Sequence, residues 1–200
     1  MYVSLGSTGG LDIILLILQK HKSTDPLVAS NGCLAVRNLA VHPKNYKTMV
    51  LNKSGAVVVD LMQSQGATNI QVAQLGSEAL ANLAADEANR AIIQHAGGIG
   101  VLLHMLSVHM NSSPNVVASA CSACSALATN NLSRQMVLQK GGAELILQAM
   151  HRYGANNINV AKWGCAALWS LIYNVESQEK LGQLGKFFVV DPIFFQTTME

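Results

Sequence analysis

The stretch Gly76-Ser77-Glu78-Ala79-Leu80-Ala81-Asn82-Leu83-Ala84 is one of four similar segments in this chain of 200 residues. The other three begin at Gly32, Ala120 and Gly164, so successive segments start 44 residues apart. In each segment the small and apolar side chains fall at the spacing of one helix face. A constant spacing of this length predicts stacked helical repeats that share one continuous core.

A glycine-containing turn precedes an apolar stretch in each repeat, at nearly the same period. The turns are Gly9-Gly10, Ser54-Gly55, Gly97-Gly98 and Gly141-Gly142. Glycine adopts the left-handed conformation that ends one helix and allows a sharp turn into the next. Each repeat is therefore predicted to contain a short helix, this turn, a second helix, a polar loop and a longer third helix.

The third helix carries the clearest pattern. A small residue stands at positions 32, 76, 120 and 164, where it allows neighbouring helices to approach closely. Four positions later each repeat has an apolar residue, which is Val36, Leu80, Cys124 or Leu168. A single repeat is too small to bury such a stripe, so the repeats are predicted to stabilise one another by stacking.

Composition narrows the classes of function. Half of the residues are hydrophobic, only 12% are charged, and the formal net charge is +2. A nucleic-acid-binding domain usually concentrates basic residues on one face, whereas Lys and Arg are scattered here. The apolar run Leu11–Leu18 contains Asp12 and is too short to span a bilayer, so it is predicted to be a buried helix. We expect neither nucleic-acid binding nor direct membrane insertion, and a location in the cytoplasm or the nucleus.

Two features resemble chemical motifs, and both are better explained by packing. Cys121-Ser122-Ala123-Cys124 has the C-x-x-C spacing, but Cys33, Ser77, Cys121 and Cys165 share one position of the repeat, where a small side chain fits. The six His residues form no ligand cluster and are expected at the surface. With no supported nucleophile–base pair, we expect no enzymatic activity, no cofactor, no metal and no small-molecule substrate.

The repeat resembles the armadillo repeat. The resemblance rests on the 44-residue unit, the turn between the first two helices, and the motifs Ala35-Val36-Arg37-Asn38-Leu39-Ala40 and Ala79–Ala84 in the third. It implies an all-α, right-handed armadillo-type solenoid of about four stacked three-helix repeats with incomplete ends. The expected repeats cover residues 1–42 (incomplete), 43–86, 87–130 and 131–174, followed by a divergent or truncated repeat at 175–200.

The last expected repeat begins with a helix over 174–184 and then departs from the pattern. Asp191-Pro192 disfavours a helix, and Phe187, Phe188, Phe194 and Phe195 are unlike a polar capping helix. The segment is either a divergent cap or part of a longer array.

The resemblance implies a protein-binding scaffold or adaptor that holds a partner peptide or helix along the concave groove of the third helices. Regulation of a small GTPase and the substrate-binding arm of a ubiquitin ligase stay open as alternatives. Carried over position by position, the expected partner-binding residues are Arg37, Asn38, Glu78, Asn82, Ser122, Lys162, Trp169 and Tyr173.

Several of these residues have a structural alternative. Asn38 and Asn82 either hold the backbone of a peptide or bond a neighbouring helix, since an amide offers donors and an acceptor. Trp169 and Tyr173, one turn apart, either stack on a ligand or pack under the C-terminal segment. Trp163 is expected on a different face, in a structural role.

Overall fold

The computed structural model describes residues 9–21, 25–173 and 175–189, and every regular element in these ranges is helical. The first helices of the repeats are η1 (Pro43–Asn45) with α4 (Tyr46–Leu51), α7 (Glu87–His95) and α10 (Asn131–Gln139). The second helices are α2 (Gly10–His21), α5 (Ser54–Gln65), α8 (Gly98–Val108) and α11 (Gly142–Tyr153). The third helices are α3 (Pro26–Leu39), α6 (Ile70–Leu83), α9 (Pro114–Leu127) and α12 (Ile158–Leu171), and α13 (Val175–Val189) follows them.

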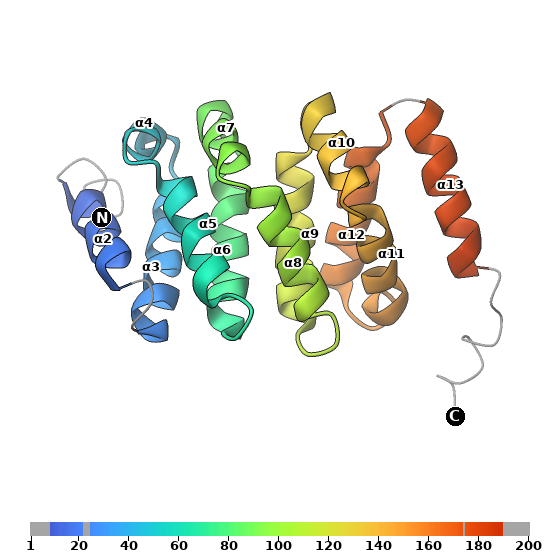
Figure 1. Cartoon of the computed structure of the whole chain (residues 1–200), viewed down its shortest axis with the longest axis horizontal. Coiled ribbons are helices and arrows are strands. Elements are labelled where there is room, and N and C mark those ends of the chain that lie inside the picture. The colour runs from blue at the N-terminus through green and yellow to red at the C-terminus, as the bar shows by residue number, and fades with distance from the viewer. Residues whose placement is uncertain (1–8, 22–24, 174, 190–200) are drawn as a thin grey trace.

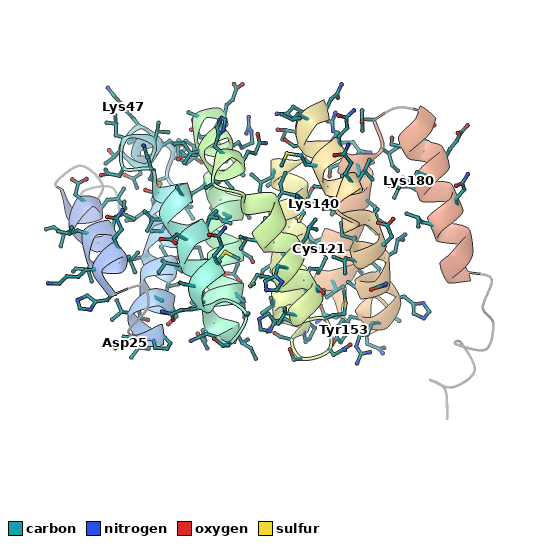
Figure 2. The ribbon with its side chains drawn as sticks, viewed as in Figure 1. Asp25, Lys47, Cys121, Lys140, Tyr153 and Lys180 are labelled. Carbon is teal, nitrogen blue, oxygen red and sulfur yellow. The ribbon has the colours of Figure 1, made fainter. Side chains whose placement is uncertain are left out.

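The second and third helices form two layers that run the length of the molecule (Figure 1). Each third helix packs against the third helix of the next repeat, and the second helices do the same. The third helices begin along one ridge, where Asp25 lies, and the first helices cross the opposite ridge, where Lys47 lies (Figure 2). The core lies between the two layers and continues from repeat to repeat.

Each third helix begins at a polar capping residue. The caps are Asp25, Asn69, Ser113 and Asn157, which stand 44 residues apart. Each side chain accepts a hydrogen bond from a backbone N–H in the first turn, as when Leu27 N–H donates to Asp25 Oδ1 at 2.8 Å. Such a cap contributes about 0.5–2 kcal/mol. A capping residue that recurs every 44 residues therefore determines where each third helix begins.

The turn between the first and second helices lies one residue earlier in the second repeat than the sequence predicts. The residues with positive φ are Gly9, Lys53, Gly97 and Gly141, again 44 apart. Lys53 has φ 51°, and it takes the place that Ser54-Gly55 was predicted to hold. Gly55 is instead buried, where a Cβ would come within 2.5 Å of Ile93 Cγ1. A glycine is needed at position 55 for close packing against Ile93 and not for the turn.

Lys53→Gly is expected to raise the free energy of unfolding by about 1 kcal/mol, because an L side chain in the left-handed region costs about 1–2 kcal/mol. Urea unfolding measures the change. The matched control is Lys47→Gly in the first turn of α4, which should lower the free energy of unfolding by at most about 1 kcal/mol. A loss at both positions would show that the Lys53 side chain contributes more than its backbone conformation costs.

Small residues bring the two layers together, as the sequence predicts. A Cβ on Gly76 would lie 2.6 Å from Met62 Cγ, and one on Gly164 would lie 2.4 Å from Met150 Cγ. These distances are shorter than any normal contact, so each glycine lets α6 or α12 approach the second helix of its own repeat. Ala120, at the same position of α9, is fully buried.

The C-x-x-C pair belongs to this core. Cys121 and Cys124 are buried free thiols, and so is Cys33. Burial raises the pKa of Cys33 and Cys121 to about 12. Burial also raises the pKa of Cys124, and the charge of Cys121 adds to that effect. These thiols therefore stay protonated near neutral pH and pack as small apolar groups. Cys165 differs, because it is exposed.

His109 corrects the expectation that the His residues lie at the surface. It follows α8 and is buried, and its Nε2–H donates to the Gly66 carbonyl oxygen at 2.7 Å. Gly66 ends α5 of the preceding repeat. The imidazole therefore satisfies a backbone carbonyl between two repeats, which is a structural role.

At the C-terminal end, α13 extends farther than the predicted helix over 174–184. It is one helix from Val175 to Val189, continuous through Gly182 and Gly185. The predicted break at Asp191-Pro192 and the two last Phe residues lie outside the described residues. Among the described helices none alone is long and apolar enough to cross a membrane. Helices α7 and α8 reach the required length and hydrophobicity only together, and a bend of 70° separates them.

Candidate functional site

A groove with a volume of about 380 Å³ lies along the third helices. All four of these helices contribute to it, since they pack side by side. Amide, hydroxyl and small apolar side chains make up most of its lining. The lining residues are Arg37, Gln74, Glu78, Ala81, Asn82, Asn115, Ala118, Ser119, Ser122, Asn159 and Trp163.

Glu78 joins three helices at the centre of the groove. Its Oε2 lies 2.7 Å from Arg37 Nε on α3. Its Oε1 accepts hydrogen bonds from Gln74 Nε2 at 3.0 Å and from Ser119 Oγ on α9 at 3.2 Å. The ion pair is partly exposed, so it contributes no more than about 1 kcal/mol. Its main effect is to hold both side chains in place and to neutralise both charges.

Asn82 makes the helix-to-helix bond that was one of its two predicted roles. Its Nδ2 donates to the Arg37 carbonyl oxygen at 3.1 Å. Asn82 Oδ1 accepts no hydrogen bond from any described residue and lines the groove. Asn38 Oδ1 accepts from Arg37 Nη1 at 3.4 Å, and its Nδ2 donates to no described residue. Each amide therefore keeps one group available beside the groove.

The other end of the groove lies between α9 and α12. Asn115 and Asn159 are equivalent residues of successive repeats, both exposed in the first turn of their helices. Trp163 lines this end, and Lys162 Nζ lies 4.5 Å from the centre of its ring. A cation at this distance over an indole is an attractive contact. The α9–α12 end thus combines amides with one aromatic surface.

Four of the predicted residues come together in the groove: Arg37, Glu78, Asn82 and Ser122. Asn38 borders it through its bond to Arg37, and Lys162 borders it through Trp163. Sequence reasoning placed Trp163 on a different face. It shares the repeat position of Ser119, which also lines the groove, and that equivalence was the available signal.

Trp169 and Tyr173 do not line this groove. Trp169 is 78% exposed on α12. Tyr173 lies beyond the end of α12 at Leu171, so it does not continue that helix face. Its ring lies 5.3 Å from the Arg134 guanidinium of α10, and its N–H donates to Ser177 Oγ at 3.1 Å.

Comparison with known proteins identifies the fold. No protein-family model matches the sequence, and no curated protein matches it significantly. A designed armadillo repeat protein in complex with the peptide (KR)4 is similar in structure, with a TM-score of 0.77, 19% identity, and coverage of 93% of this chain and 74% of that one. A second designed armadillo repeat protein has a TM-score of 0.78 and 21% identity, with coverage of 92% and 74%.

An engineered protein is also similar in structure, with 27% identity and a TM-score of 0.69. The match covers 82% of this chain and 63% of the length of that protein. These likenesses, with the helical row described above, confirm the predicted fold. The chain is an all-α armadillo-type solenoid.

Proposed function

We propose that this chain is a protein-binding scaffold or adaptor, and that it holds an extended peptide segment of its partner in the groove of α3, α6, α9 and α12. One observation carries the proposal. The groove is continuous over four equivalent helices, and it presents amide groups such as Asn82 Oδ1 that have no partner among the described residues. Such groups suit the N–H and C=O of a peptide backbone. The similar designed protein that binds (KR)4 supports this use of the fold.

The length of the groove suits a short segment. Packed helices lie about 8–10 Å apart, so three steps between four helices span about 27 Å. An extended chain rises about 3.4 Å per residue, which gives a peptide of about eight residues. Two or three peptide residues would lie over each repeat.

The charges favour a peptide with few charged side chains. Glu78 already pairs with Arg37 and accepts two further hydrogen bonds. A strongly basic peptide such as (KR)4 would have to displace Arg37 to reach this carboxylate, which is the one acidic residue of the lining. Trp163 adds a surface for an aromatic or proline side chain at the α12 end.

Selection from a random peptide library tests the proposal. We expect wild-type protein to select extended, weakly charged peptides, and Ser122→Arg to weaken their binding at least about tenfold, or about 1.4 kcal/mol. Ser122 is half-buried in the middle of the groove, so a long cationic side chain there would fill it.

Ser107→Arg is the matched control. Ser107 is exposed on α8, outside the groove, so this variant should bind the selected peptides as wild type does. Failure of wild type to select any peptide would overturn the proposal. So would equal binding by wild type and Ser122→Arg, which would place the peptides on another surface.

A further inference from the structure

One face of α12 is exposed at positions that are buried in the other third helices. Cys165 is exposed, whereas the equivalent Cys121 is fully buried. Ile172 is 44% exposed, whereas the equivalent Ala128 is 2% exposed. In α9 this face is covered by α12, and among the described residues nothing covers it on α12 itself. The face, called the α12 end face below, consists of Ala161, Cys165, Leu168 and Ile172.

Helices α2 and α3 form the opposite end of the row (Figure 1), and they carry the complementary face. On α3 the positions that would face a preceding third helix are open to solvent. Val28 is partly exposed, whereas the equivalent Val72 is fully buried. On α2, Ile13 is 60% exposed, whereas the equivalent Val57 is 7% exposed. The α3 part, called the α3 end face below, consists of Val28, Asn31, Ala35 and Asn38.

The α3 end face has the same types of residue as the contact between α3 and α6 inside the row. Val28, Ala35 and Asn38 are the same residue types as Val72, Ala79 and Asn82 of α6, at equivalent positions. Helix α6 packs against α3, Val72 and Ala79 are fully buried, and Asn82 donates across the contact to the Arg37 carbonyl. The α3 end face therefore suits contact with another third helix, on the side of that helix that faces the next repeat.

We propose that a second copy of this chain docks its α3 end face on the α12 end face, so that the row of third helices continues from one molecule into the next. The contact repeats the step by which α12 lies on α9. Neither end face carries a charged residue, so docking buries no unpaired charge. Small side chains such as Ala161 and Ala35 permit the close approach that helix packing needs.

Asn38 supplies a specific contact in this arrangement. Asn82 donates to the carbonyl of the residue 45 positions earlier, across one helix-to-helix step. By the same geometry, Asn38 Nδ2 of the second copy meets the Trp169 carbonyl of the first. This donor has no partner among the described residues of a single chain.

Helix α13 leaves the α12 end face open. It packs against α11, and Lys180 Nζ donates to the Leu138 carbonyl of α10 at 3.4 Å (Figure 2). The second copy would therefore lie beside α13. Because the two end faces differ, the association is head to tail and each added copy presents a new end face.

Two variants, each blocking one end face, test the proposal. Light scattering with size-exclusion chromatography should show wild-type protein associating beyond its monomer mass of 21.3 kDa as its concentration rises. Cys165→Arg and Asn31→Arg alter exposed residues and should each remain monomeric. Mixed together they should form a dimer of about twice that mass and nothing larger, because each retains the end face that the other lacks.

Three controls make the result specific. A reducing agent throughout removes any disulfide through Cys165, and Cys165→Ala should associate as wild type does. Gln139→Arg, an exposed residue of α10 away from both end faces, should also associate normally. Peptide binding in the groove should survive Cys165→Arg and Asn31→Arg, since neither residue lines it, so failure here is distinct from failure of the proposed function.

Monomeric wild-type protein at every concentration would overturn the proposal, and would favour coverage of the α12 end face by the chain's own residues 190–200. Association of Asn31→Arg by itself, with no complementation in the mixture, would overturn it in favour of a symmetric contact between two α12 end faces.

Discussion

Replacing Leu80 by Ala is expected to lower the free energy of unfolding by about 2–5 kcal/mol, the range measured for buried Leu→Ala substitutions. Leu80 is fully buried on α6 in the middle of the row, between α3 and α9. The substitution removes buried methyl and methylene groups and leaves a cavity that packed helices on several sides close only in part. Urea unfolding followed by circular dichroism measures the change.

Leu168→Ala is the matched control, because Leu168 occupies the same repeat position on α12. It is half-buried, since α9 covers one side of α12 and among the described residues no further third helix covers the other side. Its loss should therefore be clearly smaller than that of Leu80, when both are measured in dilute protein. Equal losses would show that Leu168 is covered as fully as Leu80, and would contradict an open α12 end face.

The period of the chain predicts most of this architecture because packing and capping repeat with it. The third helices all begin and end 44 residues apart, since both their caps and their last buried leucines recur at that step. The second turn was misplaced for a physical reason. Glycine is the usual left-handed residue, so Ser54-Gly55 was favoured, but the left-handed residue keeps the 44-residue step from Gly9 to Gly97 and therefore falls on Lys53.

The groove was predictable where its residues follow the inner face of a helix. Arg37, Glu78, Asn82 and Ser122 were found because they step by three and four residues and share equivalent positions. Trp163 was missed because it lies at the edge of that face, where the next helix decides whether a side chain is covered.

Tyr173 was misplaced because the third helix was expected to continue past Leu171, although the 44-residue step from Leu39, Leu83 and Leu127 marks Leu171 as its end. Ile172 has an extended backbone without a glycine or proline to signal it. The partner of His109, the Gly66 carbonyl, lies 43 residues away in sequence, and such a contact leaves no local pattern.

Gly76→Ala is expected to lower the free energy of unfolding by about 1–3 kcal/mol, the usual cost of adding a group to a packed core. The new Cβ would lie 2.6 Å from Met62 Cγ and 2.7 Å from its Sδ. Met62 is fully buried, so its side chain cannot swing into solvent to make room. Either Met62 leaves its preferred rotamer or α6 moves away from α5.

Gly100→Ala provides the comparison, because the same substitution there meets no other atom within 4 Å. Gly76 lies in the interior of α6 and Gly100 in the first turn of α8, and Ala stabilises a helix interior over Gly by about 0.5–1 kcal/mol. A gain of this kind is expected at both sites, so a loss of stability at Gly76 reports the contact with Met62. We expect opposite signs in urea unfolding, with Gly100→Ala more stable than wild type. Ala120 shows that a methyl group can stand at this repeat position where the facing helix has adapted to it. A stabilising Gly76→Ala would therefore mean that the second repeat adapts as readily as the third, and that close approach at Gly76 is not required for the fold.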